Sequence, residues 1–435
     1  MADLDFTKLN GALKTLYAKS YQDLVPEGNF FYKNLKFSNA EKLGDTFKQM
    51  VILTAAHGVT YGGSSATGYT LVDANPMTSA VASINGYEFT LREILPIGAI
   101  KRAYAEGPAS FVNLWTLAYE KMMSGLIDRL ELSFMYGGQG IGTALSSANV
   151  NATSTNVTFT TDTWQAGIWS GRENAQVSFY TSNTTLVSSA ADSVFTVTTV
   201  DPENRKVKFT GTATGITALD AAILANPSLV RVYFAGKNGS TPYSSFGNEP
   251  VGIQSIISNT GTLFGINAAS YGLWRGNTYS AGNAAFNFGN ATQAISQVYS
   301  RTAVKGDFTF VVSPATWNNL NTNESANRIY DSTYDKGRIE KGAKSITYHS
   351  QNGSVTFEPH HLMKEGMAFG LSRLGDSTAW RKVGSTEVTN QFQGSEKMVD
   401  LVADRNAVEV RLYADLAPFC SNPSANILIT NISNL

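Results

Sequence analysis

The chain has 435 residues, of which 43% are hydrophobic and 15% are charged, and its formal net charge is −1. The hydrophobic content is enough to bury a core and excludes a disordered chain, and the length predicts roughly two to three domains. The balanced charge excludes a global basic field for holding nucleic acid. Cys420 is the single cysteine, so an intrachain disulfide is excluded.

Residues 1–45 read as an amino-terminal arm. Apolar residues recur at helical spacing between Phe6 and Tyr17, and Pro26 and Gly28 then break the pattern. The first residues are acidic and no apolar run follows them, so we expect no secretory signal. No stretch of about 18 apolar residues occurs, so we expect no membrane span.

Residues 46–150 contain an extended segment and the strongest helix pattern of the chain. Two strand-like stretches flank a Gly-rich stretch, which predicts a protruding hairpin or loop over about residues 56–88. A helix is expected over about residues 108–136, because apolar residues recur there at steps of three and four. At a rise of about 1.5 Å per residue this helix is roughly 43 Å long, so it spans more than one packing unit. Gly137 and Gly138 are expected to end it.

Residues 151–248 are β-rich, with strand-like stretches at 157–160, 175–180, 193–200, 206–210 and 230–234. In residues 249–345, a helix is predicted over 290–299, a buried strand over 308–312, and a further helix from Ser313, the expected N-cap. Residues 346–435 return to strand-like patterns.

The order of these elements resembles the major capsid proteins of tailed phages, which have the Hong Kong 97 fold. Local sequences that look like this family are Gly107–Phe111, Leu132–Gly137, Phe310–Trp317, Gly353–His360 and Met363–Ala368. The similarity covers roughly residues 47–413. It implies an α+β fold with an N-arm, an extended loop, a spine helix, peripheral and axial domains, and a β-rich insertion.

The resemblance also implies a domain plan. It comprises an N-terminal arm (1–45), a first peripheral part with loop and spine helix (46–150), an insertion (151–248), an axial domain (249–345) and a return to the peripheral domain (346–435). We expect the segment from Gly58 to Ile84 to pack on an adjacent subunit. Candidate intersubunit contact residues are Tyr61, Tyr69, Asp331, Asp335, Lys336 and Arg338.

The function implied is a major capsid protein, not an enzyme. It would self-assemble into hexamers and pentamers of an icosahedral head that encloses double-stranded DNA, and it would be assembled in the host cytoplasm. Expected partners are a separate scaffolding protein, a portal, a decoration protein and weakly contacted DNA, with no cofactor and no membrane. The alternatives are an encapsulin-like compartment shell and a surface-layer or adhesin-like β-rich binding protein.

Other chemistry has a weaker basis in the sequence. His360, His361 and Glu365 form the nearest approach to a metal site, or to a metal-dependent hydrolase, but strand-end or surface histidines are the preferred interpretation. The glycines of 137–142 follow a helix, whereas a phosphate-binding loop follows a strand. Cys420 has no recognisable histidine partner. Five aromatics could be contacts to a carbohydrate or a partner, but local core aromatics are the preferred interpretation: Tyr61, Tyr69, Trp164, Trp169 and Trp274.

Overall fold

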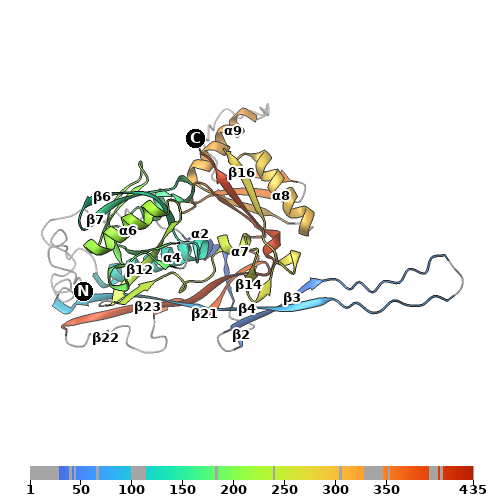
Figure 1. Ribbon diagram of the computed structural model, residues 1–435. Helices are drawn as coiled ribbons and strands as arrows, with labels where there is room; N and C mark the ends of the chain where they lie inside the picture. The colour runs from blue at the N-terminus through green and yellow to red at the C-terminus, as the bar shows by residue number, and fades with distance from the viewer. Residues whose placement is uncertain are drawn as a thin grey trace, which may run out of the picture.

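The computed structural model describes residues 29–38, 42–43, 46–64, 68–98, 114–181, 185–238, 241–302, 306–327, 346–350, 353–390, 400–401 and 405–434. These residues form a body of packed sheets and helices, from which one long hairpin projects (Figure 1). The body has one large hydrophobic core and a second, smaller one.

A long helix and a long sheet organise the centre of the body. Helix α4 (Leu114–Tyr136) covers 23 residues, about 35 Å, and buries Leu126, Leu130 and Phe134. Strand β23 (Ala407–Cys420) pairs antiparallel with β5 (Tyr87–Pro96), β21 (Trp380–Asn390) and β22 (Asp400–Leu401). The carboxyl-terminal part of the chain therefore lies beside strands from its first quarter.

Helix α4 ends where the sequence predicted, at the glycine pair. Gly138 has φ +77°, a left-handed conformation that suits glycine. A Cβ on Gly137 would lie 2.0 Å from the Pro250 carbonyl oxygen, so the backbone of residue 250 approaches too closely for a side chain. Strand β6 (Gly142–Asn151) follows the loop, so the order is helix, loop and strand. That order excludes the phosphate-loop reading of these glycines.

Residues 142–244 form a closed barrel with two flanking strands. Strand β12 (Val230–Asn238) pairs with both β6 and β8 (Gln176–Thr181), which closes the sheet in the order β12-β6-β7-β11-β10-β8. The remaining strands are β7 (Ser154–Phe159), β9 (Thr185–Leu186), β10 (Phe195–Asp201), β11 (Lys206–Thr210) and β13 (Thr241–Ser244). Closure leaves few unpaired edges. The barrel includes β6, most of which precedes residue 151, the expected start of the insertion.

The barrel interior is aromatic. Phe159, Trp169, Phe179 and Phe209 are almost fully buried, and their rings contact one another at centroid distances of 4.9 to 6.4 Å. Helix α6 (Ala213–Ala225), which the sequence analysis did not predict, packs on β6 and β7. The Thr212 hydroxyl caps it by accepting a hydrogen bond from Gly215 N at 3.0 Å.

A six-stranded sheet forms the other end of the body. Its strands are β16 (Thr278–Ala284), β24 (Ile427–Ile432), β20 (Ala368–Ser372), β17 (Phe308–Val312), β19 (Gly353–Pro359) and β18 (Ile346–Ser350), in that order. Helices α8 (Phe288–Thr302) and α9 (Pro314–Asn327) accompany it. The predicted helix over 290–299 and strand over 308–312 are confirmed. Ser313 Oγ accepts from Thr316 N at 3.2 Å, as expected of an N-cap.

Short elements complete the described fold: α2 (Phe30–Asn34), β1 (Lys36–Ser38), β2 (Lys42–Leu43), α5 (Ala166–Trp169), α7 (Ile253–Ile257), β14 (Thr262–Leu263) and β15 (Ile266–Asn267). The 3-10 turns are Thr161–Thr163, Ala190–Asp192, Gly272–Trp274 and Pro423–Ala425.

Candidate functional site

The projecting hairpin is built on two paired strands. Strand β3 (Thr46–Thr54) pairs antiparallel with β4 (Thr78–Asn85), and residues 55–64 and 68–77 continue the two strands outward (Figure 1). We call residues 46–85 the arm and residues 55–77 its tip. The two branches of the tip remain connected, since His57 N donates to Asn75 O and Val72 N donates to Thr60 Oγ1, both at 3.0 Å.

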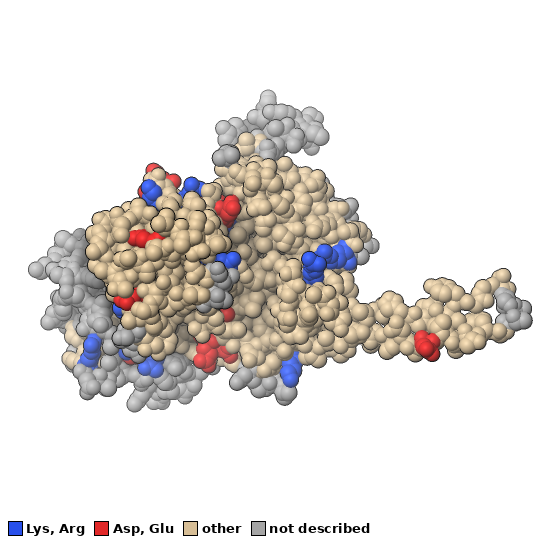
Figure 2. All heavy atoms as spheres, viewed as in Figure 1, with Lys and Arg blue, Asp and Glu red and all other residues tan. Residues whose placement is uncertain are grey.

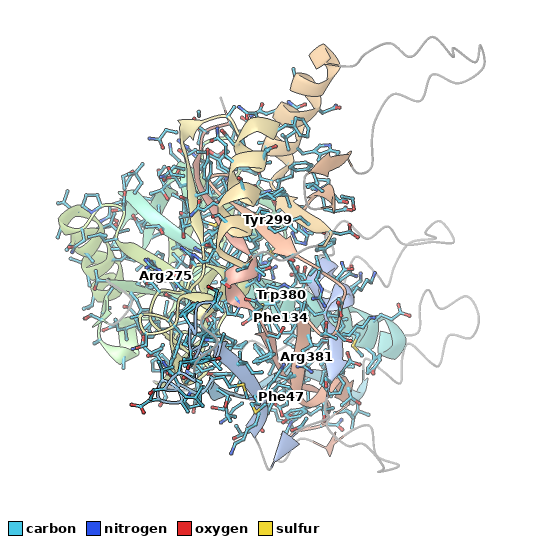
Figure 3. The ribbon with its side chains drawn as sticks, turned by 90° about the vertical axis from the view of Figure 1, so that its right-hand side faces the viewer. Phe47, Phe134, Arg275, Tyr299, Trp380 and Arg381 are labelled. Carbon is cyan, nitrogen blue, oxygen red and sulfur yellow. The ribbon has the colours of Figure 1, made fainter. Side chains whose placement is uncertain are left out.

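The root of the arm is fixed to the body by aromatic and cationic contacts. The Phe47 ring lies 5.2 Å from the Phe419 ring, and the Arg381 guanidinium lies over both, 4.9 Å from the Phe47 centroid. Arg381 also donates a hydrogen bond to the Gln49 side chain. Figure 3 shows Arg381 between Phe47 and Phe134, with Trp380 beyond Phe134. The arm therefore leaves the body from a packed base.

One face of the paired strands is apolar, and the other combines exposed apolar side chains with polar ones such as Lys48 and Ser79. On one face Phe47, Val51 and Ile84 belong to the main core or pack against it. On the opposite face Met50, Ile52 and Val81 are 64%, 55% and 53% exposed. An antiparallel sheet with one solvated face normally places mainly polar side chains there, so three large exposed apolar side chains on this face are unusual. We call Met50, Ile52 and Val81 the outer patch.

The tip exposes further large apolar side chains: Val59, Tyr61, Tyr69, Leu71, Val72 and Met77. Tyr61 is 91% and Leu71 is 75% exposed. Residues 49–86 contain one acidic residue, Asp73, and no Lys or Arg. Figure 2 accordingly shows a single acidic residue on the visible face of the arm. Large exposed apolar side chains gathered on one projecting element mark an interaction site.

Glycine 62 allows one of the tip aromatics to fold onto its own backbone. A Cβ at position 62 would lie 2.3 Å from the Tyr69 ring, a distance at which the ring has to move. The Tyr69 ring thus lies against Gly62, so part of the tip is ordered by contacts within the arm.

The candidate residues named from the sequence divide into two groups. Tyr61 and Tyr69 both lie on the tip and are exposed, so their interpretation as local core aromatics is wrong, and the structure brings them together on one projecting element. Asp331, Asp335, Lys336 and Arg338 lie outside the described residues. The three tryptophans Trp164, Trp169 and Trp274 are at most 2% exposed, which confirms their interpretation as core residues.

The histidine pair belongs to a buried structural cluster. Glu131 of α4 is fully buried and accepts hydrogen bonds from Phe31 N at 2.7 Å and Tyr32 N at 2.8 Å. His360 Nε2 lies 3.2 Å from the same carboxylate, and His360 Nδ1 accepts from Leu362 N. Glu131 therefore joins α2, the central helix and the loop after β19. Sequence reasoning missed this role, since nothing local to residue 131 indicates its partners.

A second buried group lies where α4 ends. Lys364 Nζ donates to Gly140 O at 2.8 Å and lies 3.9 Å from the Tyr136 ring centroid, and burial lowers the pKa of Lys364 to about 7. Burial raises the pKa of Glu249 to about 7. The hydrogen bonds that Glu249 accepts from Gly138 N and Ser133 Oγ act in the opposite direction and lower this pKa, but burial has the larger effect. Lys364 and Glu249 each form a hydrogen bond with the backbone of the loop after α4, at Gly140 and Gly138. Their role is therefore structural.

No catalytic arrangement emerges from the described residues. Cys420 is buried, and burial raises the pKa of its thiol to about 12, far from that of a nucleophile at neutral pH. Among the residues that the structure describes, no three His, Cys, Asp or Glu side chains could jointly hold a metal ion. None of the helices in the described part of the chain is both long and apolar enough to cross a membrane.

No family model and no curated protein sequence matches the chain. Among solved structures, a chain of the cyanophage A-1(L) capsid asymmetric unit matches with a TM-score of 0.55 and 12% identity, over 99% of this chain and 100% of that chain. The capsid of Myoviridae phage XM1 matches with a TM-score of 0.47 and 10% identity, over 96% of both chains. The SrpI encapsulin complex of Synechococcus elongatus matches with a TM-score of 0.41 and 7% identity, over 100% of this chain and 97% of that chain.

The cyanophage match shows that this chain has the fold of a phage capsid chain along nearly its whole length. The expected α+β fold of the Hong Kong 97 type is thereby confirmed.

Proposed function

We propose that the chain is a shell-building structural protein, the major capsid protein of a tailed phage, and that it self-assembles through its arm. The observation that carries this proposal is the apolar arm, which has a packed root, an exposed outer patch and a tip with a single charge. Exposed apolar side chains do not stabilise a monomer, because burial of apolar surface, and not its exposure to water, is favourable. A neighbouring copy supplies the missing surface.

The physical basis of assembly is many modest contacts per subunit. Each outer-patch or tip residue buried against a neighbour contributes on the order of 1 kcal/mol or more, and every subunit both gives and receives an arm. A contact between the arm of one subunit and a different surface of the next is a head-to-tail contact. Such contacts form a closed ring when the rotation between neighbouring subunits is a whole fraction of a full turn. Hexamers and pentamers of an icosahedral head are the rings we propose.

The domain plan follows as part of the proposal. The sheet of β5, β21 and β23 together with α4 corresponds to a peripheral domain, the barrel to an insertion domain, and the six-stranded sheet to an axial domain. Because β18, β19, β20 and β24 of the six-stranded sheet come from residues 346–435, the proposed return to the peripheral domain is narrower than that range and comprises β21, β22 and β23. Charged residues of 331–338 are proposed as further intersubunit contacts. These assignments draw on the order of elements and on the fold shared with the cyanophage capsid chain.

The proposed partners are copies of this chain, a scaffolding protein, a portal and a decoration protein, with double-stranded DNA contacted weakly from inside. The net charge of −1 supports weak DNA contact. The proposed location is the virion capsid, after assembly in the host cytoplasm. A catalytic role is not proposed, because the buried titratable groups described above serve the packing of α4 and its loops.

Electron microscopy of the expressed chain tests the proposal. We expect rings or closed shells in negative stain, alone or with phage scaffolding protein. A compact monomer that persists under assembly conditions would contradict it. Assembly with the portal and packaging of DNA would distinguish a phage head from an encapsulin-like compartment, which would instead close around protein cargo.

A further inference from the structure

Residues 360–366 form a loop at which three parts of the subunit meet, and we call it the joint loop. The loop connects β19 to β20, so both of its ends belong to the six-stranded sheet. It contacts the barrel where Glu365 N donates to Trp164 O at 3.0 Å. It contacts α4 where the Tyr136 hydroxyl donates to Leu362 O at 2.9 Å. The joint loop therefore determines how the barrel is seated on the rest of the subunit.

The backbone of the joint loop packs closely against the barrel. The His361 carbonyl oxygen accepts a hydrogen bond from Gln165 Nε2 at 2.6 Å, and a Cβ on Gly167 would lie 2.2 Å from the same oxygen. Gly366 N donates to Asp162 O at 3.2 Å, and a Cβ at position 366 would lie 2.4 Å from Asp162 Cα. Because the two backbones approach so closely, a displacement of His361 has to change the contact with the barrel.

Two stacked imidazoles at the start of the joint loop lie beside charged groups of α4. The rings of His360 and His361 are 5.3 Å apart at an interplanar angle of 23°. The charged groups that face His361 are Asp128 and Glu131 of α4, Arg172 of the barrel, and His360 itself. Helix α2 packs aromatic rings, which carry no charge, against His360. The histidine pair thus lies where a change of protonation acts on three parts of the subunit.

The hydrogen bonds of His360 fix its single proton. Its Nδ1 accepts from Leu362 N at 3.2 Å, so this nitrogen carries no proton, and the ring proton is on Nε2, which lies 3.2 Å from Glu131 Oε1. A second proton on Nδ1 would turn this acceptor into a donor and leave the buried Leu362 amide without its partner. The His360 ring therefore keeps one proton as long as the joint loop keeps its shape.

His361 has a different problem with a second proton. Its Nε2 is shielded from water and has no hydrogen-bond partner among the described residues. A neutral imidazole leaves one nitrogen without a proton, whereas a protonated imidazole carries N–H on both nitrogens. Protonation would therefore create a buried, charged donor without an acceptor, which is unfavourable. Burial and the neighbouring His360 lower the pKa of His361, although Asp128 and Glu131 act in the opposite direction.

Asp128 offers an acceptor to a protonated His361. Its Oδ2 pairs with Arg172, whereas its Oδ1 is buried without a hydrogen-bond partner in the part of the chain that the structure describes. We propose that the joint loop is an acid-sensitive switch, in which His361 moves toward Asp128 Oδ1 when it gains its second proton and the contact between the joint loop and the barrel opens. Gln165 and Gly167 hold the His361 backbone in the closed arrangement, so the two states differ in how the barrel is seated.

The direction of the switch follows from the lowered pKa of His361. The ordinary value is 6.5, so below that pH the open joint binds more protons than the closed joint, and acid favours the open joint. Above about pH 6.5 the closed joint has its full stability. Glu249 changes the stability of the whole subunit in the opposite direction over the same range, because its pKa is raised to about 7. The switch is therefore measured at single amides of the joint.

Hydrogen exchange in the full-length chain tests the switch. The protection factors of the Glu365 and Gly366 amides, corrected for the intrinsic exchange rate at each pH, should fall about fivefold or more between pH 7.5 and pH 5. Amides of the β7–β11 pairing should keep their protection, because the barrel itself stays closed. Unchanged protection at the joint, or an equal fall throughout the barrel, would overturn the switch.

Variants of the histidines identify the titrating group. His361→Gln removes the titrating ring and should keep the joint amides equally protected at both pH values. His57→Gln removes an exposed histidine from the arm tip, so it is the matched control and should show the native fall. His361→Phe keeps a ring beside His360 without a titrating group, and it provides the same test if the glutamine variant does not fold. A fall of native size in a folded His361 variant would overturn the switch.

Discussion

Met50 of β3 lies directly opposite Val81 of β4, and both side chains are more than half exposed on the same face of the arm. Ile52, two residues along β3, extends the pair into the outer patch. Directly opposed residues in an antiparallel pair are the closest cross-strand neighbours, so these side chains form one continuous apolar surface. The opposite face of the same strands packs on the body.

The outer patch should be required for assembly and unimportant for folding. Met50→Ser with Val81→Thr should leave the free energy of unfolding of the subunit within about 0.5 kcal/mol, because exposed side chains contribute little to folding. Assembly should weaken by about tenfold or more, measured as the fraction of sedimenting shells against protein concentration. Leu224→Ser, at an 86% exposed position on α6, is the matched control. Unchanged assembly of the double variant would show that the patch stays uncovered in the shell.

Gly62 should matter through the ring that lies on it. Gly62→Ala displaces the Tyr69 ring, since the added Cβ would be 2.3 Å from it. We expect slower or less complete shell assembly with an unchanged melting temperature. Gly68→Ala adds the same methyl group where nothing lies within 4 Å, so it should behave as the native chain. Equal effects of the two variants would mean that the arrangement of Tyr69 has no role.

Glu131 should stabilise the subunit by holding α2 on the central helix. Glu131→Ala leaves the Phe31 and Tyr32 amides without their acceptor in a buried position, at about 1 to 3 kcal/mol for each unmet group. Chemical unfolding should show the loss, and hydrogen exchange should show faster exchange at these two amides. Glu131→Gln keeps one acceptor oxygen and should lose less. Slow exchange at both amides in the alanine variant would contradict the assignment.

Stability should have a minimum near neutral pH. The pKa of Glu249 is raised to about 7, so the folded state binds more protons than the unfolded state above about pH 4.5, and stability falls as pH rises toward 7. The pKa of Lys364 is lowered to about 7, so the unfolded state binds more protons above that pH, and stability recovers toward pH 10. Denaturant unfolding from pH 5 to 10 measures both limbs. Glu249→Gln should remove the first limb and Lys364→Met the second. If stability still fell toward pH 7 in Glu249→Gln and still recovered above pH 7 in Lys364→Met, other groups would be responsible for the pH dependence.

Local sequence signals predicted local structure well. Ser313 before Pro314 marked the start of α9, and Gly137 with Gly138 marked the end of α4, because capping and left-handed turns depend on a few adjacent residues. The Gly-rich stretch after β3 likewise indicated the projecting hairpin.

Contacts between residues that are far apart in the chain could not be predicted from the sequence. The double pairing of β12 closes the barrel, but a strand pattern says nothing about how many neighbours the strand has. Helix α6 was missed although Thr212 is a suitable N-cap, because its small residues give little periodic contrast. Glu131 and its partner Phe31 are 100 residues apart in the sequence, so no local pattern indicates their contact. Tyr61 and Tyr69 lie on the predicted hairpin and are exposed, and their role as intersubunit contacts stays a prediction.

Deletion of the arm tip tests the central claim most directly. Replacing residues 58–73 by a short Gly-Ser turn keeps β3, β4 and the packed root, so the subunit should remain folded, with an unchanged melting temperature. Negative-stain electron microscopy of this variant beside the full chain, under identical assembly conditions, is the decisive measurement. The account predicts shells for the full chain and dispersed subunits for the variant, and normal shells from the variant would contradict it.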